Sequence, residues 1–285
     1  MEVTLLGSGG FSPTPRPTCR CAVCQEAREK GGKHVRKGNS TFFHGDNILL
    51  DTPESVMQLL NENGVESVDA VLFSHFHPDH TMGLRAISQM CLPDDTPFDG
   101  WENSSIDVFM SKHTRDRLDP ESSVPGYLLR NNADIKVIED GDEFSIGETH
   151  VTAIGWEESS ESERKDVFGY LLERNGSKVF ASPDENKNLP VNRLPKLDLW
   201  IKECGLFRKA PDGSKLRTDG FWDRMMETEL SFEQSRKQAE EVDVDRVVFT
   251  EIEEVYRRRP RDYSSLSNEL GDDMEFGYDG LHMEV

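Results

Sequence analysis

The stretch Ser74-His75-Phe76-His77-Pro78-Asp79-His80 decides the fold expected for this chain, because it places three histidines and an aspartate within six positions. It follows the apolar run Ala70-Val71-Leu72-Phe73, which is typical of a buried strand. Side chains alternate along an extended segment, so His75 and His77 point the same way. The spacing therefore predicts that these two imidazoles share one metal ion.

The second half of the stretch indicates a second metal ion. Pro78 suits the first turn of a helix, and a helix would aim Asp79 and His80 in another direction from the first pair. Histidine is otherwise scarce, with 8 in 285 residues. A strand end that presents two pairs of ligands is what a hydrolytic site with two metal ions needs.

This stretch resembles the H-x-H-x-D-H signature of the metallo-β-lactamase superfamily, and three other segments agree. Thr4-Leu5-Leu6-Gly7-Ser8-Gly9-Gly10 resembles the first strand and glycine turn of that family, and Asn47-Ile48-Leu49-Leu50-Asp51 resembles a later strand ending in aspartate. Val179-Phe180-Ala181-Ser182-Pro183-Asp184 resembles the strand that ends in the metal-bridging aspartate. The resemblance implies an α/β fold in four layers, an αββα sandwich, with the site at one edge between the sheets.

Two further motifs are similar to one branch of the family, the cyclic-phosphate phosphodiesterases of phosphonate breakdown. They are the opening Cys19-x-Cys21-x2-Cys24 and the closing Phe276-Gly277-Tyr278-Asp279-Gly280. The similarity runs almost from end to end and is strongest before residue 85. Relatives of this branch suggest a homodimer.

The resemblance also implies a set of metal ligands, and this chain carries carboxylates where the family has histidines. Glu158 stands where a further histidine would bind the first ion, and Glu251 where one would bind the second. In the active interpretation the ligands of a dinuclear site are His75, His77, Asp79, His80, Glu158, Asp184 and Glu251. Asp79 and Asp184 are also the expected catalytic carboxylates, and Asp51 orients a histidine ligand or the water.

Carboxylates in place of imidazoles favour Mn²⁺ or Fe²⁺, with Mg²⁺ as a further possibility, over Zn²⁺. The added negative charge also places the pKa of a bound water above the value of about 7 that zinc gives. The other interpretation is a decayed site, in which carboxylates without metal repel one another and some stay protonated. Each substitute can still coordinate a metal, which favours the active site.

The cysteine loop, residues 19–24, has the spacing of a tetrahedral metal site whose fourth ligand comes from elsewhere. The resemblance implies a structural Zn²⁺ held by Cys19, Cys21 and Cys24, with Glu254 standing where the family has a histidine. His34 or a water is the alternative fourth ligand, and unliganded, reduced cysteines are the alternative to zinc.

Composition limits the partners. The formal net charge is −21, and nucleic-acid affinity depends on Lys and Arg that neutralise phosphates, so a nucleic-acid partner is not expected. No apolar run approaches the ~20 residues of a membrane span, and no signal peptide is visible. With three of five cysteines at metal-ligand spacing, we expect reduced thiols and a cytoplasmic location.

Without a repeat or a flexible linker, one domain over residues 1–285 is expected. The patterning predicts the following elements: helices 54–63 and 231–241, strands 106–110, 135–138, 178–182, 197–204 and 244–250, and a hairpin of 150–156 with 168–174. Segment 205–230 is interpreted as an inserted loop. Its basic residues, Arg208, Lys209, Lys215 and Arg217, either face an anionic substrate or lie on a solvated loop.

The function expected is that of a metal-dependent hydrolase acting on a small anionic phosphodiester, with a cyclic sugar phosphate suggested by the resemblance. Asp184 and the two ions would hold the attacking water, and Glu227, aligned with a family histidine, would protonate the leaving alkoxide. The fold also hosts lactonases and thioesterases, so such a hydrolase stays open as an alternative. A catalytically decayed metal-binding scaffold is the other alternative.

Overall fold

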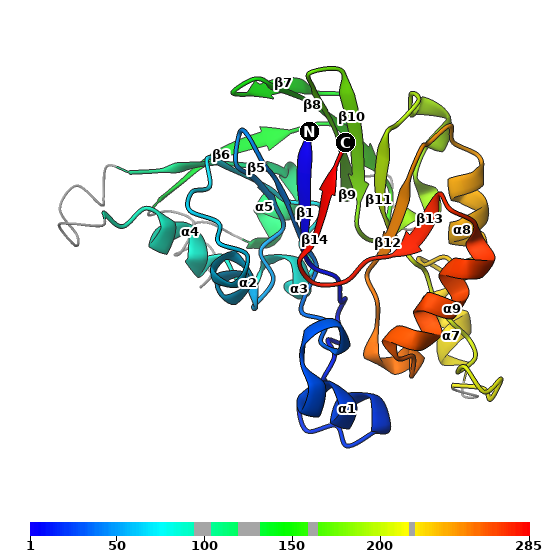
Figure 1. Cartoon of the computed structure of the whole chain (residues 1–285). Helices are drawn as coiled ribbons and strands as arrows, with labels where there is room; N and C mark the ends of the chain where they lie inside the picture. Colours follow the sequence, from blue (N-terminus) through cyan, green and yellow to red (C-terminus); the bar gives the residue numbers. More distant parts are fainter. Residues whose placement is uncertain (94–103, 119–131, 159–164, 217–219) are drawn as a thin grey trace.

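The computed structural model describes residues 1–93, 104–118, 132–158, 165–216 and 220–285. In these parts of the chain two seven-stranded sheets stack face to face and helices cover their outer sides (Figure 1). The four-layer αββα arrangement expected from the sequence is therefore confirmed.

The first sheet contains the strand that leads to the histidine motif. Its strands, in spatial order, are β14 (Leu281–Glu284), β1 (Glu2–Gly7), β2 (Ser40–Phe43), β3 (Ile48–Leu50), β4 (Ala70–Leu72), β5 (Ile106–Ser111) and β6 (Ala133–Ile138). Neighbouring strands from β14 to β3 run antiparallel, and neighbouring strands from β3 to β6 run parallel.

The second sheet is built in the same way. Its strands, in spatial order, are β13 (Met274–Phe276), β12 (Val247–Thr250), β11 (Leu199–Glu203), β10 (Ser177–Ser182), β9 (Val167–Arg174), β8 (Thr149–Trp156) and β7 (Glu143–Ile146). Strands β10 to β13 are parallel, and the hairpin expected at 150–174 is present as β8 and β9, with Trp156 opposite Val167.

Three apolar layers hold these elements together. Val3, Leu72 and Val179 belong to the core between the two sheets. Leu59 and Ile87 join helices to the outer side of the first sheet.

The helices on the outer side of the first sheet are α2 (Val56–Glu62), α3 (Pro78–Thr81), α4 (Arg85–Met90) and α5 (Lys112–Leu118). Those on the second sheet are α7 (Phe221–Met225), α8 (Phe232–Glu240) and α9 (Pro260–Leu270), and α1 (Ala22–Lys30) projects from the body with the cysteine loop (Figure 1).

Local sequence explains where the helices beside the site begin. Ser231 caps α8 in a reciprocal pair with Gln234, and Pro260 opens α9, where its missing N–H costs no hydrogen bond. Pro78 opens α3 as expected from the motif. The sequence pattern did not predict the helices α1 and α9 or the strands β7, β13 and β14.

The carboxyl ends of parallel strands from both sheets meet at one edge, and an acidic residue directly follows one such strand in each sheet. Asp51 follows β3, and Glu251 follows β12. Asp51, Glu185 and Glu251 all have φ between 55° and 60°, a left-handed conformation that is strained in residues other than glycine. Residues in this conformation are often found at functional sites. Here they turn the chain at the edge of the sheets.

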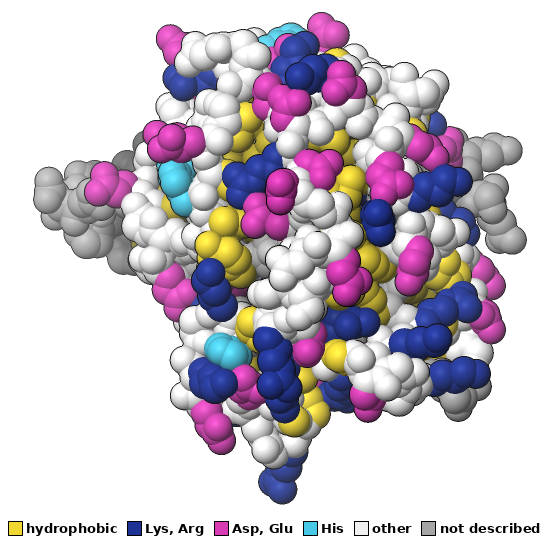
Figure 2. Space-filling model, turned by 45° about the vertical axis from the view of Figure 1, so that its right-hand side comes forward, with side chains coloured by type: hydrophobic (Ala, Val, Ile, Leu, Met, Phe, Trp, Pro, Cys, Tyr) yellow, Lys and Arg dark blue, Asp and Glu magenta, His cyan; other side chains and the backbone are white. Residues whose placement is uncertain are grey.

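The described helices include none that is both long and apolar enough to span a bilayer. On the face drawn in Figure 2, acidic and basic side chains are intermixed, without a continuous basic stripe.

Candidate metal centre

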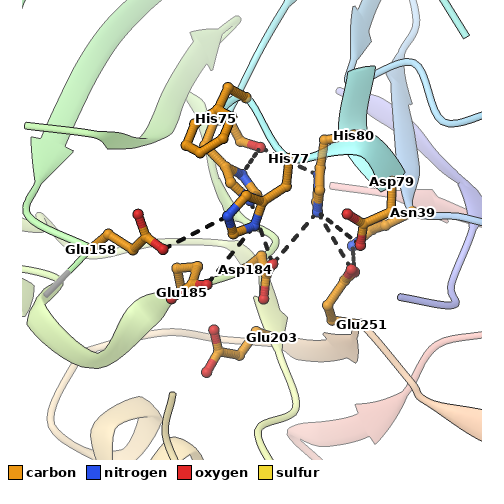
Figure 3. Close-up of polar contacts among 12 residues, drawn as sticks. Asn39, His75, His77, Asp79, His80, Glu158, Asp184, Glu185, Glu203 and Glu251 are labelled. Carbon is orange, nitrogen blue, oxygen red and sulfur yellow. Dashed lines mark hydrogen bonds and ion pairs between the residues drawn. The ribbon is translucent and has the colours of Figure 1, made fainter. Parts of the chain in front are cut away.

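The histidine motif follows β4, and it places the adjacent rings of His75 and His80 so that both face Asp184. Oδ2 of Asp184 lies 3.6 Å from Nε2 of His75 and 3.6 Å from Nε2 of His80. Figure 3 shows Asp184 below the two rings, with a dashed line to each. The family resemblance implies a carboxylate shared by two metal ions at this position, and that role of Asp184 stays a prediction.

The first group of donors surrounds His77. His75, His77 and Asp184 offer ligand atoms within 4.8 Å of one another. Nε2 of His77 also lies 3.7 Å from Oε1 of Glu158, and its Nδ1 lies 3.9 Å from Oε1 of Glu185. The structure thus brings Glu158 to the first group, and it adds Glu185, which sequence reasoning missed.

The second group of donors is Asp79, His80 and Glu251. Nε2 of His80 lies 3.5 Å from Oε1 of Glu251 and 3.8 Å from Oδ2 of Asp79. Asn39 donates a hydrogen bond of 2.8 Å to the other oxygen of Glu251 and so fixes this carboxylate. The structure therefore brings Glu251 together with His80 and Asp79, and its binding of an ion stays a prediction.

Two buried ring nitrogens without hydrogen-bond partners support the interpretation that these two groups of donors bind metal ions. Nε2 of His75 and Nε2 of His80 are buried and have no hydrogen-bond partner among the described residues. A buried polar atom without a partner is costly, and a metal ion at each group would satisfy it. Imidazole and carboxylate donors suit Zn²⁺, Mn²⁺ and Fe²⁺. The residues fit such ions, and which ions bind stays a prediction.

Asp51 is in the orienting position expected for it. Its Oδ2 lies 2.8 Å from Nδ1 of His80, and it accepts hydrogen bonds from both the backbone N–H and the hydroxyl of Ser74. The Ser74 hydroxyl lies 3.0 Å from Nδ1 of His75. Both rings are thus held by their Nδ1 atoms, and their Nε2 atoms face Asp184.

The electrostatics of the two buried histidines differ. Burial, together with the neighbouring His80 and His77, lowers the pKa of His75 well below its usual value, so that the neutral ring that binds metals is favoured. Burial also acts to lower the pKa of His80, but Asp51 and Asp79 raise it well above the usual value. Metal ions would have to displace a proton from His80.

The two groups open into a cavity of about 580 Å³. One wall carries carboxyl groups, and the other is apolar. The apolar wall is formed mainly by Leu206, Leu216, Phe221, Trp222, Met225 and Val255. Gly10 lies against the acidic wall, where a Cβ would come within 2.6 Å of Glu253 and 2.9 Å of Glu251. A side chain at Gly10 would therefore push both carboxylates away.

The structure changes the assignment of Glu227. Glu227 is exposed on the turn after α7 and does not line the cavity, whereas Glu229 does. The turn between α7 and α8, whose course the sequence pattern does not predict, brings Glu229 rather than Glu227 to the cavity.

Segment 205–230 faces the cavity with apolar side chains rather than with its basic ones. Arg208, Lys209 and Lys215 are exposed and do not line the cavity, which agrees with the solvated-loop alternative. Arg217 lies outside the described residues. The segment instead supplies most of the apolar wall, and α7 is part of it.

The cysteine loop forms a separate cluster. Oε1 of Glu254 lies 3.5 Å, 2.9 Å and 3.3 Å from the sulfur atoms of Cys19, Cys21 and Cys24. His34 is instead 3.4 Å from Glu26, so the alternative fourth ligand does not reach the thiols. Three sulfurs and one carboxylate oxygen fit a tetrahedral ion, and zinc stays the predicted occupant.

Neighbouring groups compensate the charge of this cluster. Backbone N–H groups of Arg16 and Cys24 point to the sulfurs of Cys24 and Cys21, at 3.3 Å and 3.4 Å. Arg16 contacts Glu254 at 3.0 Å, and Arg257 also forms an ion pair with Glu254. Two guanidinium groups would balance the excess charge of three thiolates and a carboxylate around one divalent ion.

Comparison with known proteins establishes the family. The model of the β-lactamase superfamily domain matches residues 46–252, so the chain belongs to this superfamily. The enzyme class expected from the sequence, a metal-dependent hydrolase, is confirmed with the family.

Individual relatives are distant or partial. An octanoyltransferase of Porphyromonas gingivalis is 34% identical over 92 residues, and a ribonuclease Z of Clostridium tetani is 27% identical over 89 residues. These matches cover 32% and 30% of this chain, which spans only 18% and 23% of the two proteins.

Solved structures match the whole chain. A diphosphatase from the PhnP family has a TM-score of 0.73 at 17% identity, with 100% of this chain and 97% of that chain covered. Zn²⁺-bound PqqB from Methylobacterium extorquens has a TM-score of 0.77 at 17% identity, with 100% of each chain covered. At this identity the likeness establishes the shared fold.

Proposed function

We propose that this protein hydrolyses a small phosphodiester, with a cyclic sugar phosphate as the substrate class. The observation that carries the proposal is the position of Asp184 Oδ2, 3.6 Å from an imidazole nitrogen of each ligand group, beside a cavity of about 580 Å³. The motifs that resemble those of cyclic-phosphate phosphodiesterases support the substrate class, and so does the fold shared with a PhnP-family diphosphatase.

The bound ions would polarise the phosphoryl group and lower the pKa of a water. The chain's own residues prepare the site for them. Asp51 and Ser74 hold the two buried imidazoles, and Asn39 holds Glu251, so that little reorganisation is needed when substrate enters. The ions expected are Mn²⁺ or Fe²⁺, because each group contains carboxylates.

The apolar wall determines what part of a substrate can lie beside the phosphoryl group. Phe221, Trp222 and Met225 would pack against carbon atoms of the ester and exclude water from that side. Glu227 faces solvent, so we assign the proton for the leaving alkoxide to water at the cavity mouth.

The same apolar wall favours a second candidate, a lactone or thioester hydrolase, whose substrate would present an acyl chain to Trp222 and its neighbours. The test is to load the protein with Mn²⁺ or Zn²⁺ and compare bis(p-nitrophenyl) phosphate and five-membered cyclic phosphates with lactones and thioesters. Asp184→Asn should abolish turnover, and the exposed Asp223→Asn should not. Turnover of the acyl substrates alone would favour the second candidate. No turnover with both ion groups occupied would indicate a scaffold.

A further inference from the structure

The two predicted ion groups leave three carboxylates of the cavity clustered together. Asp184, Glu203 and Glu229 offer oxygen atoms that all lie within 4.8 Å of one another. Glu203 ends β11, and Glu229 lies on the turn before α8. We propose that these three residues bind an additional divalent cation that prefers oxygen ligands, such as Mg²⁺, Mn²⁺ or Ca²⁺.

An unpartnered carboxylate oxygen marks the position. Glu203 is only 1% exposed, and its Oε2 accepts a hydrogen bond of 2.7 Å from the backbone N–H of Asn186. Its Oε1 is buried and has no hydrogen-bond partner among the described residues, although Glu203 lines the cavity. Figure 3 places the carboxyl group of Glu203 below Asp184 and Glu185. A cation between these groups would satisfy the unpaired oxygen.

The lysine next in the chain does not serve this purpose. Lys202 is buried, and its Nζ donates a hydrogen bond of 2.8 Å to the hydroxyl of Ser235. Because side chains alternate along β11, Lys202 points to the helix side of the sheet and Glu203 to the cavity. Glu203 therefore has no cationic partner within ion-pair distance in the described structure.

The charge of the whole cavity also calls for another cation. The carboxyl groups that line it are Asp79, Asp184, Glu185, Glu203, Glu229, Glu251 and Glu253. The single arginine in the lining, Arg257, is already paired with Glu254. Two divalent ions leave a formal excess of three negative charges on these seven carboxyl groups, which a third divalent ion would reduce to one. An anionic substrate would then meet less long-range repulsion.

The donor set determines which cation is expected. It contains three carboxylates and no imidazole or thiolate, so it suits hard cations better than Zn²⁺. Oδ2 of Asp184 already faces both His75 and His80. Its second oxygen is therefore available to the additional ion.

The decisive experiment uses zinc-loaded wild-type crystals soaked in Mn²⁺, with anomalous data collected on both sides of the manganese edge. We expect a manganese peak in contact with Asp184, Glu203 and Glu229. In solution, the Mn²⁺ bound by the zinc-loaded protein, measured by electron paramagnetic resonance, should fall by one ion per chain in Glu203→Gln/Glu229→Gln. The exposed Glu233→Gln should retain it.

Two results would overturn the proposal: no manganese peak at Glu203, or unchanged Mn²⁺ stoichiometry in the double variant. The peak is measured on the wild-type protein, so misfolding of a variant does not affect it. Failure of the proposed hydrolase function would be seen differently. In that case the ions at the two histidine groups would be absent, or no substrate would be turned over.

Discussion

Oδ2 of Asp51 lies 2.8 Å from Nδ1 of His80, and both residues are buried. This contact determines that the other ring nitrogen of His80 faces Asp184 and Glu251. The carboxylate that follows β3 in the chain thus orients a predicted ligand that follows β4, and the parallel pairing of these two strands brings them together.

Asp51→Asn should weaken metal binding while leaving the fold intact. The amide can still accept a hydrogen bond from Ser74, but it cannot stabilise the ring of His80 as a carboxylate does. Loss of such an orienting partner typically costs 10- to 100-fold in metal affinity, roughly 1.5–3 kcal/mol. Competition with a chromogenic chelator measures the affinity, and the exposed Asp69→Asn is the matched control. Equal affinities for the two variants would contradict an orienting role.

Glu251→His tests whether the carboxylate sets the metal preference. The substitution restores the imidazole found in the family, and we expect zinc affinity to rise relative to that for Mn²⁺. Glu251→Ala should lose one ion per chain and keep the ion at His75 and His77. Elemental analysis after dialysis against equal Zn²⁺ and Mn²⁺ measures the preference, with the exposed Glu241→Ala as control. Unchanged metal content in both Glu251 variants would mean that Glu251 is no ligand.

Much of the site could be predicted because it follows the ends of strands. His75, His77 and Asp184 come directly after buried apolar runs, where a short motif fixes both the position and the direction of each side chain. The departures from the family were equally visible, because Glu251 follows the recognisable strand end Phe249-Thr250.

The residues that were missed depend on tertiary contacts. Glu203 ends a strand as Asp184 and Glu251 do, so the repeated pattern of a buried strand followed by an acid could have found it. Glu229 carries no such signal, since it lies between α7 and α8 in a connection where Trp222 and Leu230 are buried. The prediction of Glu227 had the same weakness, because a segment without periodicity does not indicate which of its residues faces a cavity.

The cysteine cluster should retain its metal independently of the cavity. Cys24→Ser should lose the predicted zinc, because Cys24 is buried at the centre of the cluster and replacement removes a thiolate. Glu254→His should keep zinc and release it more slowly to a chelator, since imidazole is the commoner partner of three thiolates. Zinc release can be followed with a metallochromic dye.

Cys91→Ser is the matched control for the cluster, because Cys91 is buried away from it. Its zinc content per folded chain should equal that of the wild type. If Cys24→Ser also kept the full zinc content, the three thiols would not be the ligands.

Buried Lys202 gives the stability of the protein a specific pH dependence. Burial lowers the pKa of Lys202 to about 8, below its ordinary value of 10.5. A base with a depressed pKa in the folded state binds fewer protons there than in the unfolded chain. The associated stability is therefore fully present above pH 10.5 and is lost as the pH falls through about 8.

Lys202→Met should remove this dependence. Relative to the variant, the free energy of unfolding of the wild-type protein should rise by about 3 kcal/mol between pH 8 and pH 10.5. Urea unfolding at both pH values measures the difference, and Lys237→Met, on the exposed face of α8, should behave as the wild type does. If the wild-type and Lys202→Met proteins showed parallel pH dependence, Lys202 would be ionised equally in the folded and unfolded chains. Burial on the helix side of β11 would then not lower the pKa of Lys202.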